Sequence, residues 1–425
     1  MSRKTSRNDA RRFPNRQDVL PRTAGTVIIG GGVVGAATSY YLARAGVDVL
    51  LLEKRHLSAE ASGANAGFTW VQTKNPGVAL ELSLQSAAIY ETLSEELEFD
   101  IEFERCGGMT VCQRPEHLQV ADTIVQRQKA AGLSIELLDR DRMRELEPAL
   151  AKDIVGGIYC PLDGKMNPIF VPIAYARAAI RCGARVLTGV EVLDIEVRHD
   201  RIHSVITNQG TVATEHVVNA AGPWAAPVGQ MVNLNLPVEP AKATAMITEP
   251  APRKIKHILL CGLVLARLFG LELHENESLE GGGILQSPIR QTRAGGILIG
   301  ATLEFGKGYD KRAEASNLRR IAGHASRVVP FLAGLNVVRA WANFEPTTKD
   351  ELPILQVLDN PRGFVLAAGH TANGMLWGPI TGKLIAQAMT GEKTSIDLST
   401  LSLERFTTEK QETDHHQMRK SSNFS

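Results

Sequence analysis

Short apolar runs and amphipathic segments alternate in the first part of the chain. The β-branched run at 26–29 predicts a buried strand, and apolar residues at helical spacing over 33–45 predict a helix that ends at Gly46. The apolar run at 47–52 predicts a second buried strand, which ends at Glu53. A strand, a helix and a strand within roughly 30 residues form a βαβ unit.

The remaining pattern predicts further helices and strands. Helices are expected near 82–97, 115–131, 168–182 and 378–390, and strands near 107–111, 184–197, 216–222 and 363–369. The stretch 235–310 is strand-rich, and Asp163-Gly164 is a turn signal typical of a β-hairpin.

One segment is unusually apolar. Residues 258–271 contain a single charged side chain in 14 positions, which is too short a run to span a bilayer. A buried strand or core helix, an insertion at a membrane interface and padding for a subunit interface are the alternatives.

The composition excludes several architectures. Apolar residues make up 44% of the 425 residues and charged residues 22%, which argues against disorder, collagen or coiled coil as the main architecture. At roughly 100–200 residues per domain, the length indicates two or three domains. We expect no transmembrane helix, because no stretch of about 20 apolar residues lies outside the glycine-rich start.

The net charge of +1 conceals an uneven distribution. Residues 1–22 contain six Arg and one Lys but only two Asp, which leaves 40 basic against 44 acidic residues in the remainder. No nucleic acid is expected as a partner, because the basic residues of a nucleic-acid-binding protein should lie on its folded body. Residues 1–22 are expected to form a disordered basic extension, with a surface-anchoring arm as the alternative.

The cysteines and potential metal ligands point to no special chemistry. Five Cys are present, none in C-x-x-C spacing, and an odd number argues against a disulfide scaffold. Reduced, buried thiols are typical of the cytoplasm, and a peripheral position on the inner membrane is the alternative. The sequence shows no cluster of metal ligands, so no metal is expected.

Residues 30–35 read GGGVVG and match the dinucleotide-binding pattern G-x-G-x-x-G. The match follows a predicted strand, opens a predicted helix and precedes an acidic residue at the end of the next strand, as the motif requires. Gly30 permits a tight turn, Gly32 lets the backbone approach a pyrophosphate, and Gly35 lets helix and strand pack closely.

Two further groups complete this expected nucleotide site. The N-terminus of the helix offers free N–H groups and a partial positive charge to the phosphates. Glu53 is placed to accept hydrogen bonds from the hydroxyls of the adenosine ribose.

The motif alone does not choose between NAD and FAD. A nicotinamide dehydrogenase would usually keep its nucleotide domain contiguous. Here the strands that end in small residues at 219–222 and 366–370 indicate further, distant parts of one site. This dispersion favours FAD.

With these motifs the chain resembles the D-amino acid oxidase family of FAD-dependent amine oxidoreductases, which includes glycine oxidase and sarcosine oxidase. The resemblance rests on four segments, whose order and spacing agree over roughly residues 24–395: 30–53, 61–67, 218–224 and 339–382. The run Val71-Gln72-Thr73-Lys74 after Gly67 is most similar to the opine and hydroxyproline dehydrogenase subunits.

The resemblance implies an α/β fold in two parts. A discontinuous, Rossmann-like FAD-binding domain is expected beside a substrate domain with a mainly antiparallel sheet. The implied segments are 23–95, 155–230 and 340–400 for the FAD-binding domain, 96–154 and 231–339 for the substrate domain, and 401–425 for a polar tail.

The resemblance also implies which residues hold FAD. Ser62, Asn65, Ala66 and Gly67 should line the ribityl chain and ring edge. Val192 should contact adenine through its backbone. Ala220, Ala221 and Gly222 should bring backbone close to the dinucleotide. The full set is Gly30, Gly32, Val33, Val34, Gly35, Glu53, Lys54, Ser62, Asn65, Ala66, Gly67, Val192, Ala220, Ala221, Gly222, Trp224, Gly369, Asn373, Gly374 and Met375.

The loop at 369–376 suggests a role in flavin chemistry. Gly374 and Met375 lie just before the predicted helix at 378–390, so their N–H groups suit the N1–C2=O edge of a flavin, which becomes anionic on reduction. His370 in the same loop either braces the loop by a hydrogen bond or contacts flavin or substrate directly. His56 and Cys106 are the alternatives for a covalent attachment of flavin.

A cation should bind the carboxylate of an amino-acid substrate. Glycine oxidase-like members have an Arg for this purpose, but Ala372 stands at that position here. The candidates to replace this Arg are Lys74, Lys242, Arg290 and Arg293. For the two arginines, a position at the surface or in a turn is the alternative.

The family reaction transfers hydride from the carbon beside a neutral amine to flavin N5, and the imine product hydrolyses. Because the usual clamp is missing, we expect a secondary amine, imino acid or opine substrate, and a dehydrogenase slightly more than an oxidase. The electron acceptor is then a quinone, a partner subunit or oxygen. The alternative is a flavin-binding β-type subunit, in a homo- or hetero-oligomer, that needs a partner chain for activity.

Overall fold

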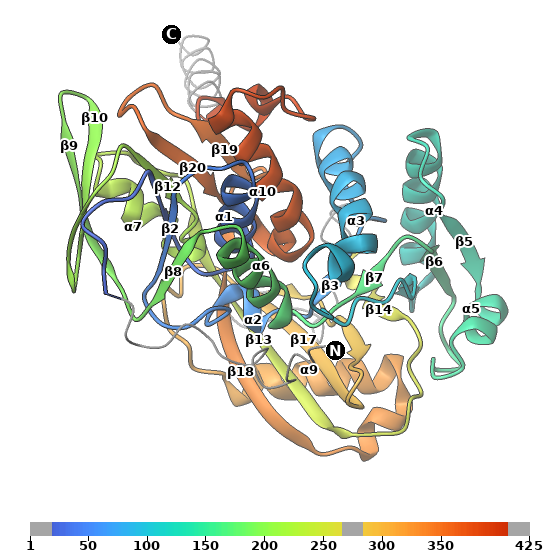
Figure 1. Cartoon of the computed structure of the whole chain (residues 1–425). Helices are drawn as coiled ribbons and strands as arrows, with labels where there is room; N and C mark the ends of the chain where they lie inside the picture. The colour runs from blue at the N-terminus through green and yellow to red at the C-terminus, as the bar shows by residue number, and fades with distance from the viewer. Residues whose placement is uncertain (1–18, 266–283, 407–425) are drawn as a thin grey trace, which may run out of the picture.

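The computed structural model describes residues 19–265 and 284–406. Two large sheets organise this part of the chain, and helices pack against both of them (Figure 1). The fold is the expected α/β arrangement, with one mainly parallel and one mainly antiparallel sheet.

The parallel sheet has six strands in the order β19-β20-β12-β1-β2-β8. Five of them are parallel neighbours, and β19 runs antiparallel to β20 at the edge. The strands come from distant parts of the chain: β1 (Thr26–Ile29), β2 (Val49–Glu53), β8 (Arg185–Thr188), β12 (His216–Asn219), β19 (Ile354–Val357) and β20 (Phe364–Ala368).

Alternate side chains of this sheet enter two separate cores. Successive residues of a strand point to opposite faces, so Ile28 packs on one face and Val27 and Ile29 on the other. The first face is covered by α1 (Val33–Arg44), α3 (Val78–Glu96), α6 (Phe170–Arg181) and α10 (Gly374–Thr390). The second is covered by α7 (Ala225–Gln230) and an antiparallel sheet of β9 (Val192–Arg198), β10 (Arg201–Thr207) and β11 (Gly210–Ala213).

The second large sheet has nine strands, in the order β18-β13-β17-β16-β14-β4-β6-β5, with β15 beside β17. All its pairs are antiparallel except β14 with β4. The strands are β4 (Gly108–Cys112), β5 (Glu136–Asp139), β6 (Gly156–Cys160), β13 (Glu239–Pro250), β14 (Ile258–Cys261), β15 (Ile284–Leu285), β16 (Ile289–Gln291), β17 (Gly296–Glu304) and β18 (Val337–Thr347).

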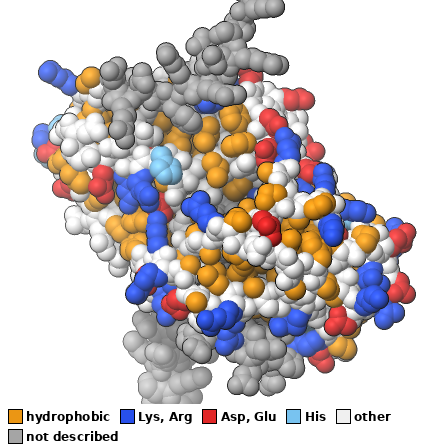
Figure 2. Space-filling model, turned by 90° about the horizontal axis from the view of Figure 1, so that it is seen from below, with side chains coloured by type: hydrophobic (Ala, Val, Ile, Leu, Met, Phe, Trp, Pro, Cys, Tyr) orange, Lys and Arg blue, Asp and Glu red, His pale blue; other side chains and the backbone are white. Residues whose placement is uncertain are grey.

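Shorter elements connect these layers. A two-stranded sheet joins β3 (Phe68–Thr69) to β7 (Gly164–Lys165). The remaining helices are α2 (Ala61–Ala64), α4 (Pro115–Ala130), α5 (Arg140–Leu146), α9 (Ala315–Val328) and the 3-10 helices η2 (Gly222–Trp224), η3 (Pro330–Gly334), η4 (Thr371–Asn373) and η5 (Leu398–Leu401). Seen from below, the surface carries Lys and Arg spread among acidic and apolar side chains (Figure 2).

Two local predictions were wrong. The expected strand 184–197 is divided at Gly189, whose φ of +75° turns the chain, so that β8 and β9 belong to different sheets. Asp163-Gly164 is not the turn of a hairpin, because β7 pairs with β3 and not with β6. The Asp163 side chain is buried and accepts hydrogen bonds instead of lying at a turn surface.

The expected domain boundaries at 155 and 340 cross the nine-stranded sheet, since β6 and most of β18 pair within it. The outer boundaries differ in a similar way. Leu20, placed in the extension, packs on the core beneath β9 to β11, and Arg405, placed in the tail, pairs with Asp350. Residues 1–18 and 407–425 lie outside the described part of the chain.

The apolar stretch begins as a buried strand. Residues 258–261 form β14, all four of whose residues are buried, and Leu263 and Leu265 are buried as well. Residues 266–271 lie outside the described part of the chain.

Candidate active site

A cavity of about 550 Å³ lies between the two large sheets. One wall is built at the carboxyl ends of β1, β2 and β12, and the opposite wall by β13 and β17. The carboxyl ends of parallel strands are where α/β sheets usually bind their ligands.

The cavity brings together residues from stretches that are far apart in the sequence. Of the predicted cofactor residues, the lining contains Gly30, Gly32, Val33, Val34, Glu53, Lys54, Ser62, Asn65, Ala66, Gly67, Val192, Ala220, Ala221, Gly222, Trp224, Asn373, Gly374 and Met375. Gly35 and Gly369 do not line it. Gly35 serves packing, because a Cβ there would lie 2.0 Å from the carbonyl oxygen of Gly30.

The glycine turn after β1 is tightly built. Gly30 has a φ of +115°, and a Cβ on it would lie 2.4 Å from the carbonyl oxygen of Ala220. A Cβ on Gly32 would lie 2.9 Å from Oγ of Ser62, which accepts a hydrogen bond from the N–H of Val33 over 2.9 Å. The first turn of α1 lines the cavity and holds no acidic residue. The positive end of this helix therefore suits an anionic diphosphate.

Glu53 is fixed at the end of β2 by its own carboxylate. One oxygen accepts a hydrogen bond from the N–H of Gly31 and the other from the N–H of Arg55, both over 2.7 Å. The Lys54 ammonium lies 4.1 Å from the ring centroid of Trp224, which places a cation–π pair beside the same end of the cavity.

The loop that follows α2 forms another wall. Oδ1 of Asn65 accepts from the N–H of Gly67 over 2.7 Å, and Nε1 of Trp341 donates to the carbonyl oxygen of Ala64 over 2.9 Å. Gly67 has a φ of +64°, which favours glycine, and its carbonyl oxygen accepts from Met166. The backbone of this loop is therefore held in place.

Helix α10 begins at Gly374, four residues earlier than predicted. Gly374 and Met375 are thus in its first turn rather than before it, and their N–H groups belong to the positive end of the helix. The Lys74 ammonium reaches this end, since it donates to Oδ1 of Asn373 and lies 5.9 Å from the ring centroid of Trp377.

His370 lines the cavity but is buried and tied to α10. Its Nε2 lies 2.9 Å from Oγ1 of Thr381, and burial lowers the pKa of the imidazole to about 3. The ring is therefore uncharged at neutral pH. This contact is the loop-bracing alternative, which argues against the catalytic role considered for His370.

The other expected cations lie elsewhere. Arg290 is buried in β16 and its Nε donates to the carbonyl oxygen of Ala66, so it neither lines the cavity nor lies in a turn. Arg293 is exposed and pairs with Asp100 over 2.6 Å. Lys242 is fully buried in β13 and lies 3.4 Å from Glu314, away from the cavity lining.

Neither expected tether lines the cavity. His56 is exposed at the surface. Cys106 packs beside Trp70 and Leu260, where burial raises the pKa of its thiol to about 11. A thiol with a raised pKa is a poor nucleophile.

Sequence reasoning missed the apolar wall of the cavity. Three large side chains line it: Trp70 from the segment after β3, Leu260 from β14 and Leu298 from β17. The apolar run at 258–271 and the strand-rich stretch 235–310 indicated buried strands, but nothing in their pattern showed which side chains face the cavity.

The family follows from comparison with known proteins. Residues 26–388 match the sequence profile of a family described as FAD dependent oxidoreductase (DAO). The chain belongs to this family. FAD is therefore its cofactor, and the chain is an oxidoreductase.

Individual relatives cover nearly the same length. The chain is 33% identical over 390 residues to glycine oxidase of Geobacillus kaustophilus, which covers 89% of this chain and 96% of that protein. It is 29% identical over 392 residues to one of the subunits of opine oxidase of Rhizobium meliloti, covering 89% and 96%.

Solved structures agree with this assignment. The crystal structure of the G. kaustophilus glycine oxidase matches with a TM-score of 0.81 and 29% identity over 90% of this chain and 99% of that one. L-proline dehydrogenase from P. horikoshii matches with a TM-score of 0.82 and 26% identity over 92% and 99%.

The groups in the cavity fit the family cofactor. The first turns of two helices, α1 and α10, line one cavity, and the glycines between them leave room that a Cβ would fill. Within residues 19–265 and 284–406, no group of three or more His, Cys, Asp or Glu could hold a metal ion. Over the same residues, no helix is both long and apolar enough to cross a membrane.

Proposed function

We propose that FAD lies along this cavity and that the chain oxidises a C–N bond of an amino acid, imino acid or opine-type secondary amine. The observation that carries the proposal is the convergence of three features on one cavity. These are the N-terminus of α1, the segment 62–67 that includes most of α2, and the N-terminus of α10.

Different segments of the cavity wall bind different parts of FAD. The diphosphate lies against the first turn of α1, where Gly32 gives close access, and the ribose hydroxyls bond to Glu53. The isoalloxazine ring lies between the loop 65–67 and the start of α10. There the N–H groups of Gly374 and Met375 face the edge that gains negative charge on reduction.

Bound FAD supplies the hydride acceptor, so the protein's task is to bind and orient the substrate. Trp70, Leu260 and Leu298 form a dry wall beside the ring position and exclude water. The α carbon of the substrate is thereby held in an apolar environment, which favours the neutral amine that must lose hydride.

Lys74 is the residue proposed to hold the substrate carboxylate. Among the residues that line the described cavity, the side chains of Lys and Arg are those of Lys54 and Lys74 alone. Lys54 packs on Trp224 at the nucleotide end, whereas Lys74 lies beside Asn373 at the flavin end. A flexible ammonium accommodates an N-substituted amino acid without the fixed geometry of a bidentate Arg.

A second candidate function concerns assembly. Relatives of this length include a subunit of opine oxidase and the HcnC subunit of hydrogen cyanide synthase. We therefore consider a β-type subunit that passes electrons to a partner chain, and we propose that a quinone or partner is a better acceptor than oxygen. Five free cysteines support a reducing compartment such as the cytoplasm.

Anaerobic screening of the purified chain tests the proposal. Primary amino acids, N-alkylated amino acids, cyclic imino acids and opines are added singly, and the flavin absorbance is followed. We expect bleaching by at least one N-substituted compound and formation of the matching carbonyl product. A yellow protein that no compound bleaches, but that bleaches when a partner chain is added, favours the subunit function. A colourless protein that does not bind FAD contradicts both.

A further inference from the structure

Arg290 is a buried cation on the cavity side of the nine-stranded sheet. In the pairing of β16 with β17, Arg290 lies opposite Leu298, and side chains of directly opposite residues share one face of a sheet. Leu298 lines the cavity, so the Arg290 side chain extends toward the same space. Its exposed fraction is only 5% because the loop at 66–67 covers it.

The guanidinium touches the backbone of this loop directly. Its Nε donates to the carbonyl oxygen of Ala66, and a Cβ on Gly67 would lie 2.9 Å from Nη2. Ala66 and Gly67 line the cavity on their other side. A single layer of backbone therefore separates the positive charge from the proposed position of the flavin ring.

No carboxylate forms an ion pair with Arg290 among the residues that the structure describes. Glu104 is taken up by Arg253 and Lys165, and Glu102 accepts a hydrogen bond from Asn167 over 3.2 Å. Burial without a close anion lowers the pKa of the guanidinium to about 10, although Cys106 and Glu102 oppose this shift. Such a charge is costly to keep in a folded protein unless a bound group compensates it.

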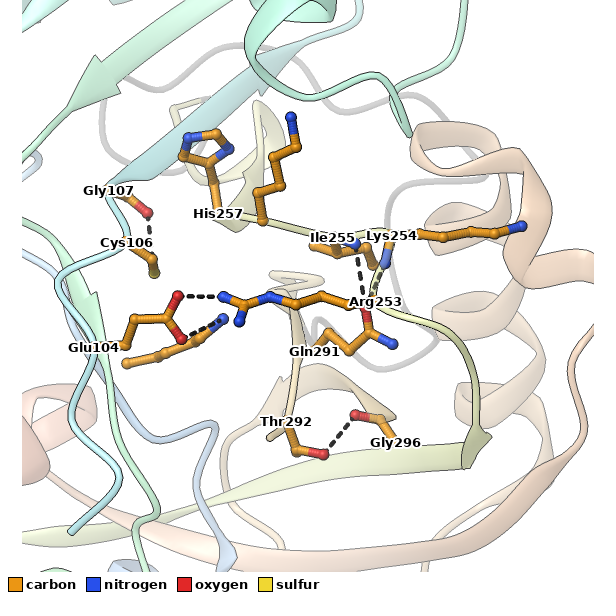
Figure 3. A network of polar contacts seen from close by, with 12 residues as sticks. Glu104, Cys106, Gly107, Arg253, Lys254, Ile255, His257, Gln291, Thr292 and Gly296 are labelled. Atoms are coloured by element: carbon orange, nitrogen blue, oxygen red, sulfur yellow. Dashed lines mark hydrogen bonds and ion pairs between the residues drawn. The ribbon is translucent and has the colours of Figure 1, made fainter. Parts of the chain in front are cut away.

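The strand that carries Arg290 is held in place by its neighbour Gln291 (Figure 3). The Gln291 carboxamide oxygen accepts from the N–H groups of Lys254 and Ile255 over 2.9 and 3.2 Å. The two N–H groups of its nitrogen are shared among three carbonyl oxygens within 3.1 Å, including that of Gly295 at 3.0 Å. Because both ends of the carboxamide are used, β16 cannot shift without breaking several hydrogen bonds, and the Arg290 charge keeps its place.

We propose that Arg290 is a positioning residue whose buried charge stabilises the reduced, anionic flavin through the Ala66–Gly67 backbone. This inference rests on the proposed place of FAD in the cavity. When the substrate C–H bond breaks, its hydride passes to flavin with both electrons. The neutral amine becomes an iminium cation, and the reduced flavin gains one negative charge. A fixed cation nearby lowers the free energy of that state and raises the reduction potential.

The test compares Arg290→Gln and Arg290→Lys with the control Arg293→Gln, an exposed Arg three residues away. The reduction potential of bound FAD is measured anaerobically against reference dyes, and the affinity for sulfite, which adds to flavin N5, is measured by absorbance. For Arg290→Gln we expect a more negative potential and at least about tenfold weaker sulfite binding. Arg290→Lys should remain close to the wild type at neutral pH, and the control should not change.

Other results have definite meanings. An unchanged potential and unchanged sulfite affinity in FAD-loaded Arg290→Gln overturn the inference, also when KM for carboxylated substrates rises. If Arg290→Gln does not hold FAD, the inference is tested with Arg290→Lys instead, because a buried Lys loses its proton more readily than Arg. Its potential should then fall more steeply with rising pH than that of the wild type, and parallel pH profiles overturn the inference. A wild-type chain that binds no FAD contradicts the proposed function instead.

Discussion

At the scale of single residues, the nucleotide end of the cavity depends on positions where no side chain fits. Gly30, Gly32 and Gly35 each face a neighbouring atom at less than the contact distance of a Cβ. These roles were predictable because the motif is local. The burial of Arg290 was not predictable, since it depends on the loop at 66–67, which lies more than 220 positions away in sequence.

Gly32→Val should weaken FAD binding by about 1–3 kcal/mol, roughly 5- to 160-fold, because its side chain would meet Ser62 and the diphosphate position. FAD titration of the apoprotein measures the effect. Gly323→Val is the control, because that exposed glycine has no atom within 4 Å of the added Cβ. A yellow, fully active Gly32→Val protein would refute the placement of the diphosphate.

Lys74→Met should raise KM for carboxylated substrates by a factor that corresponds to about 1–3 kcal/mol, the cost of a lost charged hydrogen bond. The change in kcat should be smaller. Steady-state kinetics with a substrate and its methyl ester measure the effect, which should be absent for the ester. Lys129→Met on the exposed side of α4 is the control. Equal KM values for acid and ester in both wild type and variant would remove Lys74 from the carboxylate site.

At the scale of elements, the segment that carries Lys74 is held by a buried polar network. Asp163 accepts from the N–H of Val71 and from Nε2 of Gln72, both over 2.6 Å, and Gln128 of α4 donates to the carbonyl oxygen of Gln72. The sequence suggested a hairpin turn at Asp163, because Asp-Gly usually marks an exposed turn. Tertiary contacts with a distant loop overrode that local signal.

Asp163→Ala should lower the free energy of unfolding by about 2–4 kcal/mol, because it leaves two buried donors without their acceptor. Chemical denaturation measures the loss. We also expect a higher KM for carboxylated substrates, since Lys74 would lose its fixed position. Asp153→Ala, at an exposed position, should change neither quantity. Wild-type stability in Asp163→Ala would show that the network does not hold the segment.

At the scale of the whole molecule, the dispersed motifs predicted both the family and the parallel sheet, because β1, β12 and β20 each end at a recognisable run of small residues. The domain boundaries could not be read in the same way. Strand β6 and strand β18 join the nine-stranded sheet through pairings that no local pattern specifies. The apolar wall of the cavity could not be predicted for the same reason, because pairings within this sheet decide which of its side chains face the cavity.

Buried histidines should make the fold sensitive to acid. Burial lowers the pKa of His370 to about 3 and that of His324 to about 4, whereas a histidine in the unfolded chain titrates near about 6.5. Below that pH the unfolded state binds more protons, so stability falls as the pH drops from about 6.5 toward 4. Asp163 acts in the opposite direction, because burial raises its pKa to about 7 and its contribution is lost as pH rises from about 4 to 7.

The difference between variants isolates the histidine effect. His370→Gln should flatten the fall in unfolding free energy between pH 6.5 and 4.5 by about 2 kcal/mol relative to the wild type. Exposed His203→Gln should leave the profile unchanged. Thermal or chemical unfolding over this pH range measures both, and parallel profiles for His370→Gln and wild type would contradict the assignment of a neutral, buried ring.

The most direct test of the account is an experimental structure of the chain with FAD bound. We predict the diphosphate against the first turn of α1 at Gly32. The isoalloxazine ring should lie between Ala66–Gly67 and Gly374–Met375, with Trp70 and Leu298 on the substrate side. A dinucleotide bound elsewhere, or one that contacts only one of these segments, would contradict the claim that they form a single site.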